Sequence, residues 1–422
     1  VSYVWGVQSI DQDFEGSPFT EGRFAFTPPA FEDITQTAFG GDVPDALTEG
    51  ELILADINTD GSLDLIAAGL SPSGSAVFQV YLNQDGNFIL DPSNNELPGY
   101  RSATLAAGDW DGDNDPDIFI TGRLDSDNSL QALIYRNDNG ILIPETQASA
   151  NLTGVSRGDA AWGDFDRDGD EDLIVIGLGE TTQQTILYRN DGTNGMNPVT
   201  APVIDEEGFV DVSDGGVAWG DFDVDEGSAD SLDNRLDLAI TGIDANQNPV
   251  SIVYQNRGNG QFSEFARTAL PQLQGGDISF ADLDQNGYPD LILTGQNPSQ
   301  IRETVIYPYN VAQGRFEVDN PFLTTMIPGV IDGVLITGDY DDDGLSDLLL
   351  SGRETSNPSF TGATFKNIND ETPRTFQKDL LSSGDLDSIN IRRPIWGDIN
   401  NDQKLDIVAL GGTSFGSGAE SF

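Results

Sequence analysis

The stretch Asp164-Phe-Asp-Arg-Asp-Gly-Asp-Glu-Asp172 decides the fold, because versions of it recur along the chain. Acidic or amide residues stand at its first, third, fifth and ninth positions, and a glycine stands at the sixth. Copies begin at residues 56, 109, 164, 221, 282, 339 and 398 of the 422-residue chain. They are about 57 residues apart, so seven repeats take up nearly the whole length. Residues 1–422 are therefore predicted to form one domain.

Each motif stands between two short apolar blocks. The block before it ends in glycine or alanine, as in Ala-Trp-Gly163, and the block after it is closed by a glycine such as Gly177. A third block ends in an aromatic-x-Asn signature, as in Tyr188-Arg-Asn190, and a weaker fourth block follows, as in Phe262-Ser-Glu. Apolar blocks this short, bounded by turn residues, are typical of β-strands. Four strands in each of seven repeats predict an all-β protein, a seven-bladed β-propeller with four-stranded blades.

The last repeat has too few residues to complete its own blade, since only residues 407–422 follow its motif. Residues 1–50, in contrast, offer more chain than the first inner strand needs, and they contain apolar stretches such as Val1-Ser-Tyr-Val-Trp5. We therefore expect N-terminal strands to close the last blade. The same strands could instead complete a neighbouring molecule, which would build a head-to-tail polymer. Both alternatives stay open at this point.

The nine-residue motifs have the composition of oxygen cages. Side chains at positions one, three and five of a tight loop converge on one point, the carbonyl at position seven points inward, and the aspartate at position nine closes the sphere. Several anionic oxygen ligands in flexible geometry favour Ca²⁺ over Mg²⁺. The predicted ligand positions are Asp56, Asn58, Asp60, Ser62 and Asp64; Asp109, Asp111, Asp113, Asp115 and Asp117; Asp164, Asp166, Asp168, Asp170 and Asp172; Asp221, Asp223, Asp225 and Asp237; Asp282, Asp284, Asn286, Tyr288 and Asp290; Asp339, Asp341, Asp343, Leu345 and Asp347; and Asp398, Asn400, Asp402, Lys404 and Asp406.

The seven copies differ at the sixth position and in length. Asn114 replaces the glycine in the second loop and tolerates the same backbone, whereas Gln403 in the last loop does so less readily, which predicts a weaker site. The loop that begins at Asp221 carries an insertion, so either Asp225 or Asp233 can stand at its fifth position. The loops at 221 and 398 therefore depart most from the motif.

A simpler interpretation is that each motif is a turn without metal, because Asp, Asn and Gly favour turns on their own. Seven copies in register count against this interpretation. Like charges held within a few ångströms of one another are costly without a counter-ion. We therefore interpret the motifs as binding sites for up to seven Ca²⁺ ions.

The repeats resemble FG-GAP/VCBS repeats, such as those in the N-terminal propeller of integrin α subunits, from Asp56 to Gly411. The resemblance implies Ca²⁺ in the loops between the first and second strands of each blade, on the lower face of the propeller. It also implies that partners bind the upper face, which is formed by the loops between strands two and three and between strands four and one.

The composition excludes several classes of protein. The chain has neither Cys nor His, which rules out disulfides, Cys/His zinc sites and His-based catalytic triads. It has 19 Lys and Arg against 71 Asp and Glu, a formal net charge of −52, so we expect no binding to nucleic acid and no insertion into membranes. Nearly every clustered carboxylate belongs to a predicted metal loop, so no enzymatic activity is expected.

The pattern predicts an extracellular, secreted or cell-surface module that binds Ca²⁺ and acts in adhesion, in interaction or in a surface structure. Its partner would be a protein or a glycan on the upper face. Two alternatives are a filament or surface-layer subunit that assembles by strand donation, and a lectin-like propeller. Weak Ca²⁺ sites fill only where free Ca²⁺ is millimolar, which favours the extracellular setting. Arg157-Gly-Asp159 matches an adhesion tripeptide, but it lies at the start of a predicted first strand and is interpreted as a coincidence.

Overall fold

The regular structure of the chain is almost entirely β-strand. The computed structural model describes residues 2–7, 20–25, 35–40, 47–94, 96–192, 195–200, 202–203, 208–223, 233–265, 270–319, 327–354, 360–368, 375–379, 392–411 and 420–421. The helical elements within them are α1 (Thr35–Ala38), η1 (Pro92–Asn94) and η2 (Ala148–Asn151). None of the described helices is long and apolar enough to cross a membrane.

Five sheets of the described chain have four antiparallel strands each, and the strands pair in sequence order. They are β3 (Thr48–Ala55), β4 (Asp64–Leu70), β5 (Ala76–Gln84) and β6 (Asn87–Leu90); β7 (Tyr100–Gly108), β8 (Asp117–Leu124), β9 (Leu130–Asp138) and β10 (Ile141–Pro144); β11 (Ser156–Gly163), β12 (Asp172–Leu178), β13 (Gln183–Asn190) and β14 (Met196–Pro198); β15 (Val217–Gly220), β16 (Asp237–Ile243), β17 (Pro249–Asn256) and β18 (Phe262–Glu264); and β24 (Val330–Gly338), β25 (Asp347–Glu354), β26 (Phe360–Ile368) and β27 (Thr375–Lys378).

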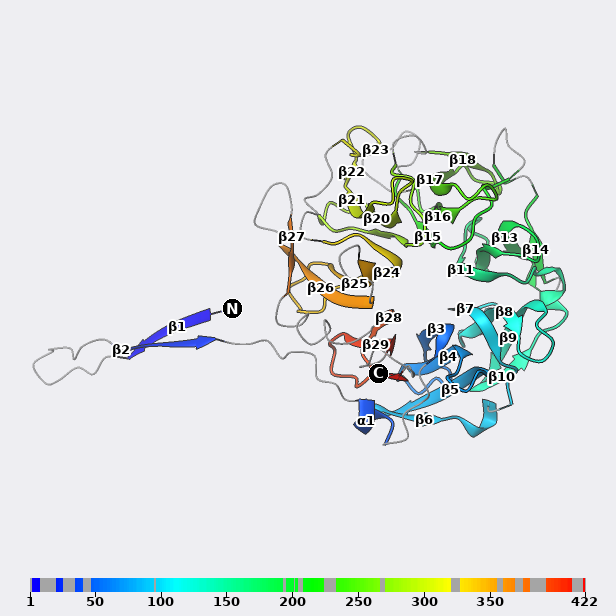
Figure 1. Cartoon of the computed structure of the whole chain (residues 1–422), viewed down its shortest axis with the longest axis horizontal. Helices are drawn as coiled ribbons and strands as arrows, with labels where there is room; N and C mark the ends of the chain where they lie inside the picture. The colour runs from blue at the N-terminus through cyan, green and yellow to red at the C-terminus, as the bar shows by residue number, and fades with distance from the viewer. Residues whose placement is uncertain are drawn as a thin grey trace, which may run out of the picture.

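The sheets form a ring, with the first strand of each nearest the centre (Figure 1). This arrangement confirms an all-β propeller with four-stranded blades. The predicted count of seven complete blades is not confirmed, because two further sheets of the described residues are irregular.

The first irregular sheet has β19 (Ile278–Ala281), β20 (Asp290–Gln296) and β21 (Arg302–Tyr307), and is followed by a separate pair, β22 (Tyr309–Asn310) and β23 (Arg315–Phe316). Pro308 stands between β21 and β22. Because proline has no N–H to donate to a sheet, it explains the interruption. The second irregular sheet has β28 (Arg392–Gly397), β29 (Asp406–Gly411) and β30 (Glu420–Ser421).

The predicted closure of the last blade by N-terminal strands differs from the pairing found. Among the described residues, β1 (Ser2–Val7) and β2 (Thr20–Ala25) pair with each other in a two-stranded sheet, and β29 pairs with β28 and β30. Strands that are close in sequence pair at a lower cost in loop-closure entropy than strands from opposite ends of a chain. That difference favours the local hairpin.

The ring is nevertheless closed by side chains. Phe39, just after α1, and Leu47 belong to one apolar cluster with Ile399 and Val408 of the last sheet and with residues of β3, β4 and β5. The N-terminal part of the chain therefore contributes packing between the last sheet and the first.

Glycines at the ends of the first strands allow neighbouring sheets to pack closely around the axis. A Cβ on Gly163 would lie 2.9 Å from Cδ1 of Trp219 in the next sheet, and one on Gly108 would lie 2.5 Å from Cγ of Trp162. The indole of Trp219 also donates a hydrogen bond to the carbonyl of Ala161 at 3.2 Å. The Ala-Trp-Gly blocks of the sequence thus set the contact between adjacent sheets.

Candidate metal centres

The nine-residue loops join the first strand of each sheet to the second, as expected, and share one conformation. In the third loop, Asp164 accepts hydrogen bonds from the backbone N–H groups of Asp168 and Gly169, both at 3.1 Å. The sixth residue has a positive φ in every loop, from +58° at Asn234 to +96° at Gly169. The same bond from the sixth residue to the first carboxylate recurs at Gly61, Asn114, Gly169, Asn234, Gly287, Gly344 and Gln403.

Gln403 was predicted to adopt this backbone less readily than glycine. In the structure its φ is +70°, and its N–H donates to Asp398 at 2.7 Å. The last loop therefore has the same fold as the others. The strain of a left-handed glutamine remains as a physical reason for the predicted weaker site.

The aspartate at the ninth position is buried and anchors the loop. Asp172 has no solvent exposure. One of its oxygens accepts the N–H of Phe165, at the second loop position, and the other accepts the N–H of Asn190, at the end of the third strand. This residue therefore has a structural role in addition to its predicted role as a metal ligand.

Carboxylates from the first, third and ninth positions come together in five loops. In each group, one oxygen from every residue lies within 4.8 Å of the others. The five groups are Asp109, Asp111 and Asp117; Asp164, Asp166 and Asp172; Asp221, Asp223 and Asp237; Asp282, Asp284 and Asp290; and Asp339, Asp341 and Asp347. The first and last loops have Asn58 and Asn400 at the third position and keep the same hydrogen bonds.

The donor set fits a hard cation. Oδ1 of Asp166, Asp223 and Asp341, all at the third position, is buried and has no hydrogen-bond partner. A buried carboxylate oxygen without a partner is costly, so such oxygens require an explanation. A bound Ca²⁺, which takes six to eight oxygen ligands, would satisfy them.

The electrostatics of the loops point the same way. Burial raises the pKa of Asp172 and Asp290 to about 8 and that of Asp117 and Asp347 to about 7, and neighbouring loop carboxylates add to the rise. The side chains and backbone of the loops alone therefore do not fully stabilise the negative charge that the loops carry. A divalent cation would relieve this repulsion and restore the ionised forms.

The sequence left Asp225 and Asp233 as alternatives for the fifth position of the fourth loop. Asp233 has 1% exposure, and its side chain accepts the N–H of Arg235, two residues further on. Asp60 accepts the N–H of Ser62 in the same way at the fifth position of the first loop. Asp233 therefore has the hydrogen bond typical of the fifth position, which favours this alternative. Asp225 lies outside the described residues, and its role as a ligand stays a prediction. The insertion separates Asp223 from Asp233 in sequence, which is why spacing alone could not decide between them.

The seventh positions were predicted to contribute their carbonyl oxygens. Ser62, Asp115, Asp170, Leu345 and Lys404, together with Tyr288, all donate their N–H to the fifth side chain. The side chains of Tyr288 and Leu345 are buried at 8% and 7% exposure. They serve packing, while the role of the carbonyls in metal binding stays a prediction.

The asparagines of the aromatic-x-Asn signature link neighbouring loops, a role that the sequence interpretation missed. Asn190 uses its backbone N–H to bind Asp172 of its own loop, and its Nδ2 donates to the carbonyl of Trp110 in the preceding loop at 2.7 Å. The same bridge occurs from Asn83 to Ile399, from Asn137 to Ile57, from Asn256 to Phe165 and from Asn367 to Leu283. The recurrence of asparagine at a constant distance from the motif was the available signal.

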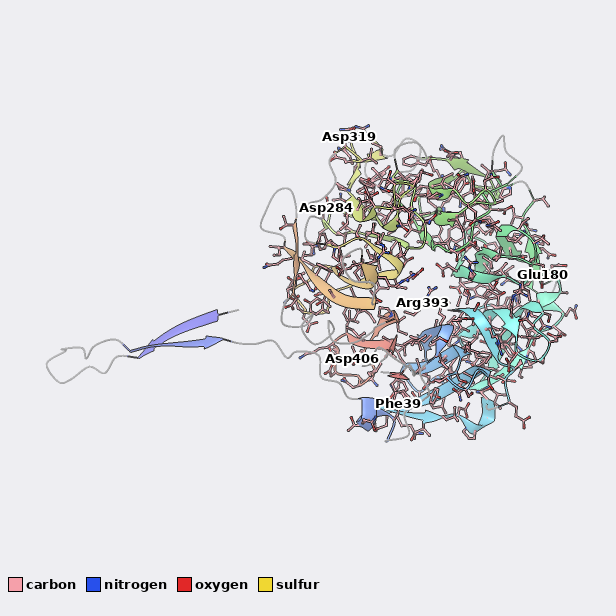
Figure 2. The ribbon with its side chains drawn as sticks, viewed as in Figure 1. Phe39, Glu180, Asp284, Asp319, Arg393 and Asp406 are labelled. Atoms are coloured by element: carbon pink, nitrogen blue, oxygen red, sulfur yellow. The ribbon has the colours of Figure 1, made fainter. Side chains whose placement is uncertain are left out.

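The opposite ends of the first strands surround a cavity of about 270 Å³ on the axis. Asp159 and Asp277 lie in its wall, and Glu51 follows Gly50 of the wall in sequence. Each of these three carboxylates accepts a backbone N–H from the first strand of the next sheet, at 2.9 to 3.0 Å. Arg393 lies 3.6 Å from Glu51 and is found beside the centre of the ring (Figure 2).

Arg157-Gly-Asp159 is part of this inner rim and not of a protruding loop. Arg157 forms two hydrogen bonds of 2.6 Å with Asp214 of the next sheet, and Asp159 bonds to the backbone of Val217. Both charged side chains therefore hold neighbouring sheets together, in line with the interpretation of the tripeptide as a coincidence.

The fold and the loops define a class, β-propellers whose blades carry aspartate-rich loops at one end of the first strand. A family model described as the FG-GAP-like repeat matches residues 56–120, 109–175 and 232–293. These parts of the chain thus match FG-GAP-like repeats, as the resemblance indicated.

Known proteins with similar sequence or fold were also found. The T-cell immunomodulatory protein of Rattus norvegicus is 23% identical over 412 residues, which cover 90% of this chain and 63% of that protein. The chain thus spans less than two thirds of this relative. Among solved structures, AofleA from Arthrobotrys oligospora has a TM-score of 0.45 and 13% identity. The match covers 76% of this chain and 84% of the AofleA chain. A mutant Aleuria aurantia lectin in complex with alpha-methyl-L-fucoside has a TM-score of 0.43 and 12% identity. The match covers 76% of this chain and 94% of the lectin chain. Scores this low carry no argument about what this chain binds.

Proposed function

We propose that the protein is an extracellular, non-catalytic propeller that binds Ca²⁺ in its aspartate loops and interacts with a protein or a glycan through the opposite face. The observation that carries the proposal is the set of buried, unpartnered oxygens of Asp166, Asp223 and Asp341, each within a group of three converging carboxylates. Turns without metal would not require carboxylates to converge in this way.

The bound ions would act as cross-links. Each Ca²⁺ would join the start of a loop to its ninth aspartate, and that aspartate is already bonded to the third strand of the same sheet, as Asp172 is to Asn190. We propose up to seven such sites in a ring of seven blades, with those at 221 and 398 departing most from the motif. The ions would offset part of the formal net charge of −52.

The interaction face is proposed to be the one opposite the loops. It carries the axial cavity and the turns between second and third strands, such as residues 71–75 and 123–129. The relative named above is described by its name as immunomodulatory, and a role in recognition at a cell surface is in keeping with that description. An extracellular setting is proposed because millimolar Ca²⁺ fills even weak oxygen sites. Self-association through the N-terminal strands stays a prediction.

Native mass spectrometry in millimolar calcium acetate tests the proposal directly. The intact chain is expected to carry several Ca²⁺ ions and to lose one when Asp164 and Asp166 are both changed to Asn. Asp125→Asn, which removes a carboxylate outside the loops, is the matched control and is expected to keep the full number. A chain that binds no Ca²⁺ under these conditions would refute the proposal.

A further inference from the structure

One loop has a lysine beside its third carboxylate. Lys366, in the third strand of its sheet, places Nζ 2.6 Å from Oδ2 of Asp341 and 3.6 Å from Asp379. Tyr340 at the second loop position donates its hydroxyl hydrogen bond to the same Asp379, and its ring lies 5.4 Å below the ammonium group. The lysine is therefore held by a built arrangement of groups and not by a chance surface contact.

The residue between the aromatic and the asparagine of the signature differs from sheet to sheet. It is Leu82, Gln255 and Pro308 in three sheets and Arg136, Arg189 and Lys366 in three others. Arg136 is bonded to Glu145 and Arg189 to Asp191, both outside the metal loops. Lys366 alone among these six binds a predicted metal ligand directly.

We propose that Lys366 sets the Ca²⁺ affinity of the loop that begins at Asp339, making it the weakest of the four loops with glycine at the sixth position. This inference rests on the proposed function, since it assumes that the loops bind Ca²⁺. Oδ1 of Asp341 remains free for a metal, because the lysine binds only Oδ2. The ammonium group therefore does not block the site and acts by repelling the incoming cation.

The size of the effect follows from Coulomb's law. A unit charge and a divalent ion about 6 Å apart in a medium as polar as water repel each other enough to lower affinity about tenfold, and partial burial increases the repulsion. A loop tuned in this way would stay empty when the stronger loops are full. It would respond to Ca²⁺ at higher concentrations than its neighbours.

The test is a Ca²⁺ titration of the 422-residue chain labelled with ¹⁵N-glycine. The amides of Gly61, Gly169, Gly287 and Gly344 each donate to the first aspartate of one loop, so each amide reports directly on the ligand of its own loop. In the natural protein, Gly344 is expected to shift at the highest Ca²⁺ concentration. Lys366→Met, which keeps the apolar stem, is expected to lower the midpoint for Gly344 about tenfold and to leave the other three unchanged.

Two controls separate charge from packing. Lys366→Arg keeps the positive charge and is expected to keep the weak midpoint, and Arg101→Met removes a charge at a distant ion pair with Asp125 and is expected to change none of the four. Lys366→Gln serves as a second neutral variant. An unchanged or higher midpoint for Gly344 in both neutral variants, with the other glycines titrating normally, overturns this inference only. Failure of all four glycines to respond to Ca²⁺ overturns the proposed function as well.

Discussion

Asn83 donates a hydrogen bond from Nδ2 to the carbonyl of Ile399, 2.7 Å away and 316 positions later in the chain. The same side-chain bond joins consecutive loops elsewhere in the ring, as from Asn137 to Ile57. The last loop is therefore connected to the first sheet by the same device that connects internal neighbours. This bond, together with the packing of Phe39, closes the ring within one molecule.

Replacement of Asn83 by Ala is expected to lower the free energy of unfolding by about 1–3 kcal/mol, because the buried carbonyl of Ile399 loses its donor. Asn310→Ala is the matched control. Asn310 holds the corresponding place next to the interrupted strand, but its amide binds Glu317 of its own sheet. Urea unfolding followed by tryptophan fluorescence measures both variants. Equal losses in the two would show that the bridge to Ile399 adds nothing.

Removal of Ca²⁺ is expected to lower the melting temperature by at least about 10 °C, since each site held at a hundred times its Kd contributes about 2.7 kcal/mol. Calorimetry in chelator, and then with excess Ca²⁺ or Mg²⁺, measures the change. Recovery should be larger with Ca²⁺, because Mg²⁺ demands a stricter geometry and keeps its waters. A melting temperature that is insensitive to the chelator would contradict the assignment of the loops.

The fourth loop offers a test of which aspartate, Asp233 or Asp225, is the ligand at its fifth position. Asp233→Asn is expected to remove or weaken one Ca²⁺ site, because this buried side chain stands beside Asp223 and Asp221. Asp225→Asn is expected to leave the number of bound ions unchanged. Both are measured by native mass spectrometry over a range of Ca²⁺ concentrations. The opposite ranking of the two variants would restore Asp225 as the ligand.

The axial carboxylates predict a pH dependence of stability. Burial raises the pKa of Glu51 and Asp277 to about 7, and the charge of Asp159 adds to the rise in both. A folded-state pKa above the unfolded value means that the native state binds more protons between about pH 4 and pH 7. The free energy of unfolding should therefore fall as the pH rises through this window, by up to about 1 kcal/mol per unit for each group.

Unfolding in chelator at pH 5, 6, 7 and 8 measures this dependence. The pKa values of the loop carboxylates are raised as well, but these groups are present in every variant. The difference between variants therefore measures the contribution of the axial carboxylates alone. The double variant Glu51→Gln, Asp277→Asn is expected to show a shallower fall than the natural protein. Glu180→Gln, at an exposed side chain, is the control and should keep the full slope. The prediction fails if the double variant loses stability with pH as steeply as the natural protein does.

Much of the architecture could be predicted from local pattern. The motif from Asp164 to Asp172, the apolar blocks around it and the aromatic-x-Asn signature predicted four antiparallel strands per repeat and loops between the first and second strands. These features depend on residues close together in sequence, where turn preference and alternation of apolar residues act directly. The left-handed sixth residue was also foreseeable where it is glycine or asparagine, whereas Gln403 adopts this backbone although the sequence predicted that it would do so less readily.

What the sequence alone determined was the repeat: its strands, its loops and the oxygen-rich composition of each candidate site. Only the tertiary structure decided which distant groups meet. It placed Asp233 at the fifth position of the fourth loop, joined Asn83 to Ile399, and put Lys366 against Asp341. It also paired β1 with β2 and not with the last sheet. The physical reason is that such contacts depend on how the sheets are arranged around the axis, and no local propensity specifies that arrangement.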